Sequence, residues 1–176
     1  AKYLKKMVAP YSIPNAVRFI DTLKHASNAF APPQLNRNDT AVLLYTGGTT
    51  GVAKGAMISH ANIIANLMQF RSRSVLAMDD RCESVAAPLP LYHSYAFLMH
   101  CFAMPYAGNH SVLITNPRDI SGLIKALSRY RVSGFVGINT LYSAIMRHPS
   151  FSNYDKKHLK FCGAGGMAMS SSIAEE

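Results

Sequence analysis

Short apolar runs alternate with longer amphipathic stretches along most of this chain. Five of these runs are rich in Val, Ile, Ala or aromatic residues, which is typical of buried strands. They lie at residues 41–46, 84–87, 111–115, 132–138 and 159–162. A further run, Ala56–Ile58, follows the first after a loop so rich in glycine that the two predict a hairpin.

The stretches between the strands repeat their apolar residues at helical spacing. After Ser59, a residue typical of a helix N-cap, the apolar residues Ile63, Ile64, Leu67 and Met68 share one helical face. The same spacing predicts helices over residues 15–26, 60–76 and 119–130. Residues 93–104 are apolar nearly all round and predict a buried helix, and residues 140–147 predict a further helix that Pro149 ends. Strands that alternate with helices predict an α/β fold, namely a doubly wound, mainly parallel sheet with helices on both faces.

Sheets of this kind bind their ligands at the carboxyl ends of the strands. The loops that follow the predicted strands are therefore the first candidates for a functional site. Besides the loop after the first strand, those at 88–94, 116–119, 139–140 and 163–166 contain Gly, Pro, Asn or His.

The two ends of the chain depart from this rhythm. Residues 1–8 resemble the tail of a basic amphipathic helix that Pro10 and Pro14 stop, so residues 1–38 are interpreted as a lead-in with a Pro-rich loop. Residues 39–176 carry the strand and helix pattern. A helix-capping signature, Ser172–Glu175, stands one residue before the end and predicts that the chain is a piece of a longer protein.

Composition narrows the class of protein. Of 176 residues, 49% are hydrophobic and only 15% are charged, which excludes a disordered chain. The net charge of +9 is scattered, with no basic stripe interleaved with aromatic residues, so it favours anionic small molecules first, a membrane surface second and nucleic acid least. The longest apolar run, 95–107, is interrupted by His100 and Pro105 and is too short to span a bilayer.

Cysteine usage points to a reducing compartment. Cys82, Cys101 and Cys162 are odd in number and isolated in the sequence, so we expect them to act as small core hydrophobes in a cytoplasmic protein. The seven histidines show no spacing typical of a metal site, and no GxSxG motif is present that would indicate a serine hydrolase.

The loop after the first strand has the composition of a polyphosphate site. It combines three glycines, three threonines and one lysine, namely Thr46, Gly47, Gly48, Thr49, Thr50, Gly51 and Lys54. Glycines let consecutive backbone N–H groups converge on an anion, while the hydroxyls and the ammonium group add donors and charge. A Walker loop requires Gly directly before Lys, whereas Val52 and Ala53 intervene here. The sequence therefore predicts a phosphate-binding loop at the tip of a hairpin.

This stretch, T-G-G-T-T-G-V-A-K-G-A-M-I-S-H-A-N, resembles the phosphate-binding signature of the adenylate-forming (AMP-binding) superfamily, and bacterial long-chain fatty-acid–CoA ligases most of all. Gly48 and Ala53 stand where that signature usually has Ser and Pro. Four downstream segments resemble the family as well, although Ala168 replaces a usual proline. They are P-L-Y-H-S-Y-A, I-T-N-P-R-D-I, G-I-N-T-L-Y and G-A-G-G-M-A-M.

The resemblance implies that residues 39–176 are a truncated AMP-binding subdomain within the large N-terminal domain of such an enzyme. It implies ATP, Mg²⁺ and coenzyme A as cofactor and co-substrates, a long-chain fatty acid as substrate, and a cytoplasmic location that includes the inner membrane face. The glycines, threonines and Lys54 of the loop would hold the β- and γ-phosphates. The segments expected to bind ribose and Mg²⁺ and to supply a catalytic lysine are absent, so we expect this piece alone to be inactive.

Two further segments acquire roles from the resemblance. His93 would orient the acyl carboxylate, with Tyr95 beside the same carboxylate and the path of the thiol. Gly165 and Gly166 would lie against the adenine or the acyl chain. The alternatives are a buried histidine at a helix start and an ordinary turn before a helix. At the level of the whole protein, an enzyme for an aryl or amino acid and a non-catalytic nucleotide- or acyl-binding module remain open.

Overall fold

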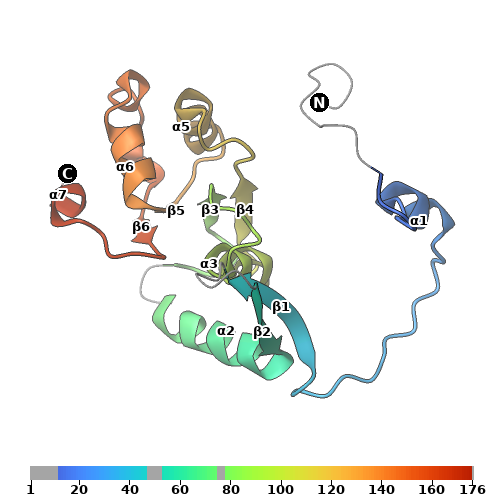
Figure 1. Ribbon diagram of the computed structural model, residues 1–176. Helices are drawn as coiled ribbons and strands as arrows, with labels where there is room; N and C mark the ends of the chain where they lie inside the picture. The colour runs from blue at the N-terminus through green and yellow to red at the C-terminus, as the bar shows by residue number, and fades with distance from the viewer. Residues whose placement is uncertain (1–11, 47–52, 75–77, 176) are drawn as a thin grey trace. The chain divides into compact units, whose positions relative to one another are not determined.

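The computed structural model describes residues 12–46, 53–74 and 78–175 (Figure 1). The chain divides into two compact units, residues 1–35 and 36–176. Within the first unit, helix α1 (Phe19–His25) occupies the later part of the helix predicted over 15–26 and buries none of its residues. The amphipathic helix predicted over residues 1–8 lies outside the described residues.

The second unit begins with the predicted hairpin. Strands β1 (Thr40–Thr46) and β2 (Lys54–Ser59) pair antiparallel, and Thr46 lies directly opposite Lys54 at the end next to the connecting loop. Helix α2 (His60–Ser74) follows without a break. The Ser59 hydroxyl accepts a hydrogen bond from the Asn62 N–H (3.2 Å), and the Asn62 side chain accepts one from the Ser59 N–H (3.0 Å). This reciprocal pair confirms Ser59 as the residue that fixes the helix start.

A four-stranded parallel sheet forms the centre of this unit. Its strands lie in the order β4-β3-β5-β6. Their bounds are β3 (Ser84–Ala87), β4 (His110–Leu113), β5 (Gly134–Gly137) and β6 (Phe161–Ala164). All four strands were predicted, but β5 is shorter than the predicted run 132–138 and β6 lies two residues later than predicted. The apolar residues that precede β5 and β6, Val132 and Leu159, pack in the core on one face of the sheet instead.

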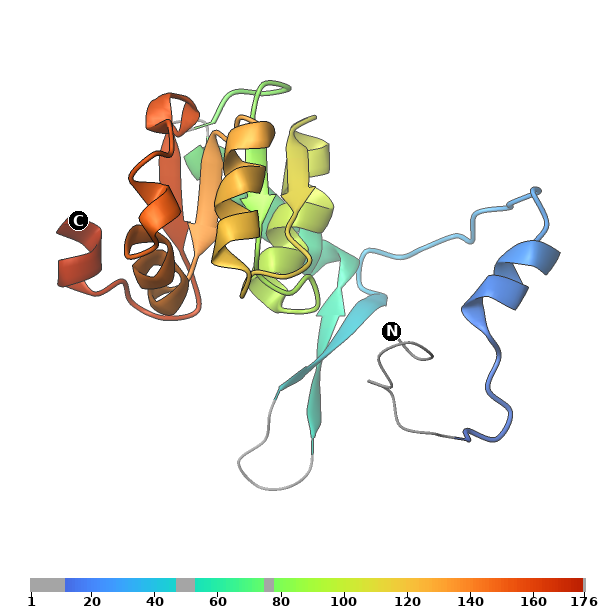
Figure 2. The same ribbon diagram turned by 90° about the horizontal axis from the view of Figure 1, so that it is seen from above.

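Helices cover both faces of this sheet, as Figure 2 shows. On one face, Ala86 and Phe135 pack with residues of α5 (Ile120–Arg129) and α6 (Asn139–Met146). On the other face, their strand neighbours Val85 and Val136 pack against the segment 94–106 and α2. Because side chains alternate along a strand, adjacent residues reach opposite cores. The doubly wound α/β fold predicted from the sequence is confirmed.

The segment predicted as one helix over 93–104 is built in three parts. A short α3 (Ser94–Ala96) leads into the π-helix η1 (Phe97–Ala103), which continues as α4 (Met104–Tyr106). In η1, His100 is buried with 6% of its surface exposed, and its Nδ1 lies 3.0 Å from the Ser111 hydroxyl of β4. Burial lowers the pKa of His100 from 6.5 to about 4. The wider π turn is rare and is often found next to functional sites.

The remaining elements follow the last two strands. They are the 3-10 turns η2 (Pro149–Phe151) and η3 (Lys156–His158) and the short helix α7 (Ser171–Glu175). Within the described ranges, no helix is long and apolar enough to cross a membrane. The expectation for the cysteines was wrong, because all three are exposed. Cys82 lies in a turn before β3, Cys101 on the outer side of η1, and Cys162 on the edge strand β6.

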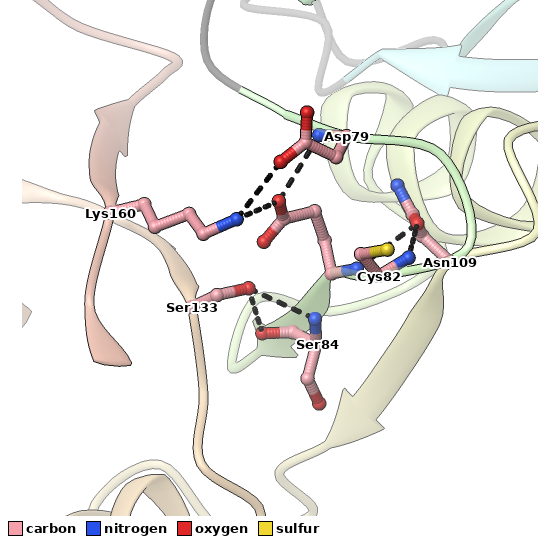
Figure 3. Close-up of polar contacts among 7 residues, drawn as sticks. Asp79, Cys82, Ser84, Asn109, Ser133 and Lys160 are labelled. Carbon is pink, nitrogen blue, oxygen red and sulfur yellow. Dashed lines mark hydrogen bonds and ion pairs between the residues drawn. The ribbon is translucent and has the colours of Figure 1, made fainter. Parts of the chain in front are cut away.

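Polar side chains join the amino ends of all four strands (Figure 3). Lys160, just before β6, places its Nζ 2.7 Å from Oε1 of Glu83, just before β3, and 3.1 Å from Asp79. Asn109, just before β4, accepts the backbone N–H groups of Cys82 and Glu83 at 3.2 Å. The Ser133 hydroxyl, just before β5, accepts the Ser84 N–H at 3.0 Å. The strand entries are thereby fixed to one another.

Glu83 is the buried member of this network, with 2% of its surface exposed. Burial by itself raises the pKa of a carboxyl group. Hydrogen bonds from Lys160, Ser133 and the Asp79 backbone outweigh that effect and hold the pKa of Glu83 below its usual 4.5. The same contact with Glu83 raises the pKa of Lys160.

Candidate functional site

At the carboxyl ends of its strands, the sheet has a point at which neighbouring strands send their connections in opposite directions. The connection from β3 leads to β4 over one face, whereas the connection from β5 leads to β6 over the other. The loops after β3, β5 and β6 enclose a hollow of about 280 Å³ at this point. It is lined by Leu89, Pro90, His93, Tyr95, Ile138, Gly165, Gly166 and Met167. Its position is the one where doubly wound sheets bind ligands.

His93 stands at the start of α3 as its N-cap. Its Nδ1 accepts the Tyr95 N–H at 3.4 Å, so the neutral ring carries its proton on Nε2. The alternative of a buried helix-start histidine is half right, because His93 does start a helix but its side chain is exposed. A neutral imidazole with an outward N–H can donate a hydrogen bond to an oxygen of a bound carboxylate or carbonyl.

Tyr95 and the two glycines meet in the same hollow. A Cβ atom on Gly165 would lie 2.9 Å from the Tyr95 ring, so the ring lies flat against the bare backbone there. Gly166 has a φ of +82° and open space around its Cα, which makes it the residue that turns the chain. Burial raises the pKa of the Tyr95 hydroxyl. The two positions therefore require glycine for different physical reasons. Gly165 allows the close approach of the Tyr95 ring, and Gly166 allows the positive φ.

A larger apolar cavity adjoins the hollow. It has a volume of about 740 Å³ and lies between the sheet, α5, α6 and α7. Its walls are mostly apolar, including Phe135, Ile145 and Ile173. Met167 lines both this cavity and the hollow at the strand ends. A volume of this size falls within the range of about 300–1,000 Å³ that is usual for small-molecule sites.

Two side chains of α6 hold the glycine segment, and neither was assigned a role from the sequence. Asn139 Nδ2 donates to the Ala168 carbonyl at 2.9 Å. The Tyr142 hydroxyl lies 2.7 Å from the Gly163 carbonyl and 3.1 Å from that of Phe135. Both residues belong to the segment G-I-N-T-L-Y, so the resemblance of this segment to the family was a signal that could have singled them out.

The predicted phosphate loop is described only at its two ends. Thr46 closes β1 opposite Lys54, whose side chain is exposed at the start of β2. Gly47, Gly48, Thr49, Thr50 and Gly51 lie outside the described residues. At its base the hairpin shares a hollow of about 310 Å³ with Ser94 and the first residues of η1. The root of the hairpin thus adjoins the segment that starts at His93.

The sequence matches the model of the AMP-binding enzyme family over residues 4–176. The chain belongs to this family. It is 42% identical over 176 residues to the long-chain-fatty-acid–CoA ligase of Haemophilus influenzae, an alignment that covers 98% of this chain. The same alignment covers 31% of that protein, so the chain spans about a third of the length of the curated relative.

Solved structures share the fold at lower sequence identity. The inhibitor-bound N-terminal domain of FACL13 from Mycobacterium tuberculosis is 18% identical and has a TM-score of 0.79. ATP-bound MatB from Rhodopseudomonas palustris is 24% identical, with a TM-score of 0.76. Each comparison covers 89% of this chain, together with 38% and 30% of the respective structure. The fold is that of part of the N-terminal domain of an adenylate-forming enzyme.

Proposed function

We propose that the whole protein is an ATP-dependent, AMP-forming long-chain fatty-acid–CoA ligase. In this proposal, a fatty-acid carboxylate oxygen attacks the α-phosphorus of ATP, pyrophosphate leaves, and an acyl-adenylate remains. The thiol of coenzyme A then attacks the acyl carbonyl, and AMP leaves with the electrons of the broken mixed-anhydride bond. The observation that carries the proposal is the hollow at the strand ends, where His93 meets Tyr95 and the glycine turn beside a large apolar cavity.

The hairpin is assigned to the polyphosphate. Lys54 pairs with Thr46 in the register of the hairpin, next to the loop, so its ammonium group would lie near a phosphate that the loop held. The loop glycines and threonines supply N–H and hydroxyl donors. Each charge-assisted hydrogen bond is worth about 1.5–3 kcal/mol, which suits the stabilisation of a departing pyrophosphate. Mg²⁺ would accompany the phosphates and neutralise their charge.

The carboxyl edge of the sheet is assigned to the acid and its adenylate. The Nε2–H of His93 would donate to the carboxylate and orient the attacking oxygen. Gly165 and Gly166, which have no side chains, would let the adenylate lie against the backbone. The adjoining apolar cavity supports a long aliphatic chain as substrate, because burying methylene groups there is favourable by roughly 0.8 kcal/mol each.

The proposed setting is the cytoplasm, where ATP and coenzyme A are available. The net charge of +9 would favour contact with the anionic inner face of the membrane. Vesicles with and without anionic lipid test this part separately from catalysis. Binding that does not depend on anionic lipid would contradict it.

Acyl-CoA formation by the full-length enzyme tests the substrate class. Palmitate, octanoate, an aromatic acid and an amino acid are each supplied with Mg·ATP and coenzyme A, and AMP and thioester are measured. We expect palmitate to give the highest kcat/KM and the isolated chain of 176 residues to give no turnover. Activity confined to the aromatic acid or the amino acid would show that the proposed substrate class is wrong. No activity with any acid would favour a non-catalytic binding module.

A further inference from the structure

The segment 163–170 forms a wall between the two cavities. Gly165 and Gly166 face the hollow at the strand ends, whereas Ala168 and Met169 face the larger apolar cavity. Met167 lines both. Met167 is thus the residue shared by both linings, and an aliphatic chain that extended from the hollow into the larger cavity would lie beside it.

The first turn of α6 holds this wall near both of its ends. Asn139 Nδ2 donates to the Ala168 carbonyl (2.9 Å) and lies 3.6 Å from the Met167 sulfur. Its Oδ1 accepts the Ser170 N–H at 3.3 Å. Three residues further along the helix, and so on the same face, the Tyr142 hydroxyl holds the Gly163 carbonyl at 2.7 Å.

These hydrogen bonds hold a segment whose two glycines give it few conformational restrictions of its own. Glycine backbone has more conformational freedom than any other, and Gly166 already lies at positive φ. The unbranched side chain of methionine adapts to whatever surrounds it, so the place of the Met167 thioether depends on how its backbone is held. Figure 1 shows α6 beside the strand β6 and the segment that leaves it toward α7.

We propose that Asn139 and Tyr142 are positioning residues that set the chain-length preference of the enzyme by fixing Met167 at the passage between the two cavities. The inference rests on the proposed function, since it concerns the same acyl substrate. A short acid ends within the smaller hollow and does not need the passage. A long acid needs it open, so a loosened wall must be ordered again each time a long chain binds.

Full-length Asn139→Ala enzyme tests this with palmitate and octanoate. The loss of two or three hydrogen bonds to the wall is expected to lower kcat/KM for palmitate about ten-fold, with less than about two-fold change for octanoate. The KM for ATP stays unchanged. Asn139→Asp keeps the acceptor for Ser170 and falls between wild type and Asn139→Ala. Tyr142→Phe shifts the preference in the same direction, and the adjacent Thr140→Ala, at an exposed position outside the wall, changes neither acid.

An equal loss for both acids, or an equal effect of Thr140→Ala, overturns the assignment and leaves a purely structural role. Amide hydrogen exchange over residues 163–170 separates this inference from the function it rests on. Faster exchange there in Asn139→Ala supports the anchor, and unchanged exchange overturns it even if the wild-type enzyme activates no fatty acid. Thioester formation by the wild type decides the proposed function on its own.

Discussion

The two ends of the four-stranded sheet are built from opposite kinds of contact. At the amino ends, Glu83 is buried and paired with Lys160, while Asn109 and Ser133 hold the neighbouring strand entries. At the carboxyl ends, exposed His93 and the glycine turn line an open hollow. The same short strands are thus fixed at one end and leave the other end open to ligands.

Residues at the amino ends of the strands therefore stabilise the fold, whereas residues at the carboxyl ends form the candidate functional site. In a parallel sheet, all amino ends of the strands lie on one side and all carboxyl ends on the other. Polar pairing between the amino ends therefore leaves the carboxyl ends unoccupied. The amino edge can hold a buried charge because partners neutralise it. The carboxyl edge can carry an exposed histidine and glycines, which contribute little to stability. We expect substitutions at the two edges to have opposite signatures.

Substitution of His93 should give the largest effect at the carboxyl edge. In the full-length enzyme, His93→Ala is expected to slow acyl-adenylate formation about 100-fold, within the usual range for a positioned imidazole. The melting temperature should stay nearly unchanged because the side chain is exposed. Tyr92→Ala, at an exposed neighbouring residue outside the hollow, is the matched control and should keep its rate. If His93→Ala lost rate and stability in parallel, the proposed difference in role between the two ends of the sheet would be contradicted.

The converse test is at the amino edge. Glu83→Gln removes the buried charge that Lys160 and Ser133 surround, and is expected to lower the free energy of unfolding by about 1–3 kcal/mol without changing kcat. Lys160→Ala should destabilise in the same direction because it leaves the carboxylate buried without its cation. Lys157→Ala breaks an exposed pair with Asp155 and serves as control, with little effect. Denaturant unfolding measures the stability of all three variants. A variant that loses kcat but keeps its full stability would contradict this division of roles between the two ends of the sheet.

The smallest expected effect is a pH dependence from His100, which is buried in η1 against Ser111 of β4. The pKa of His100 is about 4 when folded and 6.5 when unfolded, so the unfolded chain binds more protons between these values. Stability should therefore fall as pH decreases through this window, by about 1 kcal/mol per unit. The contribution of Glu83 is lost only below its usual pKa of 4.5, so unfolding between pH 6.5 and 5 isolates His100. His100→Gln should flatten this slope, and an unchanged slope would exclude His100 as its source.

The sequence predicted the sheet because β3 and β5 lie in short, mainly apolar runs, and the segments between the strands repeat their apolar residues at helical spacing. It placed His93 and Gly165 after strands, and the structure brings both residues into one hollow, while their roles stay predictions. It assigned no role to Asn139 and Tyr142, because their partners in the glycine segment, the carbonyls of Ala168 and Gly163, lie 29 and 21 residues further along the chain. It also missed the π-helix, since apolar residues all round a segment do not fix the number of residues per turn.

The exposed cysteines show a further limit. Cys is usually buried, so composition favours the core, but exposure depends on which strand lies at the edge of the sheet. Cys162 belongs to β6, which is an edge strand here, and that order follows from long-range pairing alone. The roles of Thr46–Gly51 and Lys54 in phosphate binding remain predictions.

ATP–pyrophosphate exchange by the full-length enzyme with palmitate tests the central claim most directly, because it reports acyl-adenylate formation without coenzyme A. We expect wild-type exchange that depends on palmitate and falls about 10- to 100-fold in Lys54→Ala, as the loss of one charge-assisted phosphate contact implies. The melting temperature of Lys54→Ala should match the wild type. Exchange that does not need palmitate, or that is unchanged in Lys54→Ala, would contradict the assignment of the hairpin to pyrophosphate.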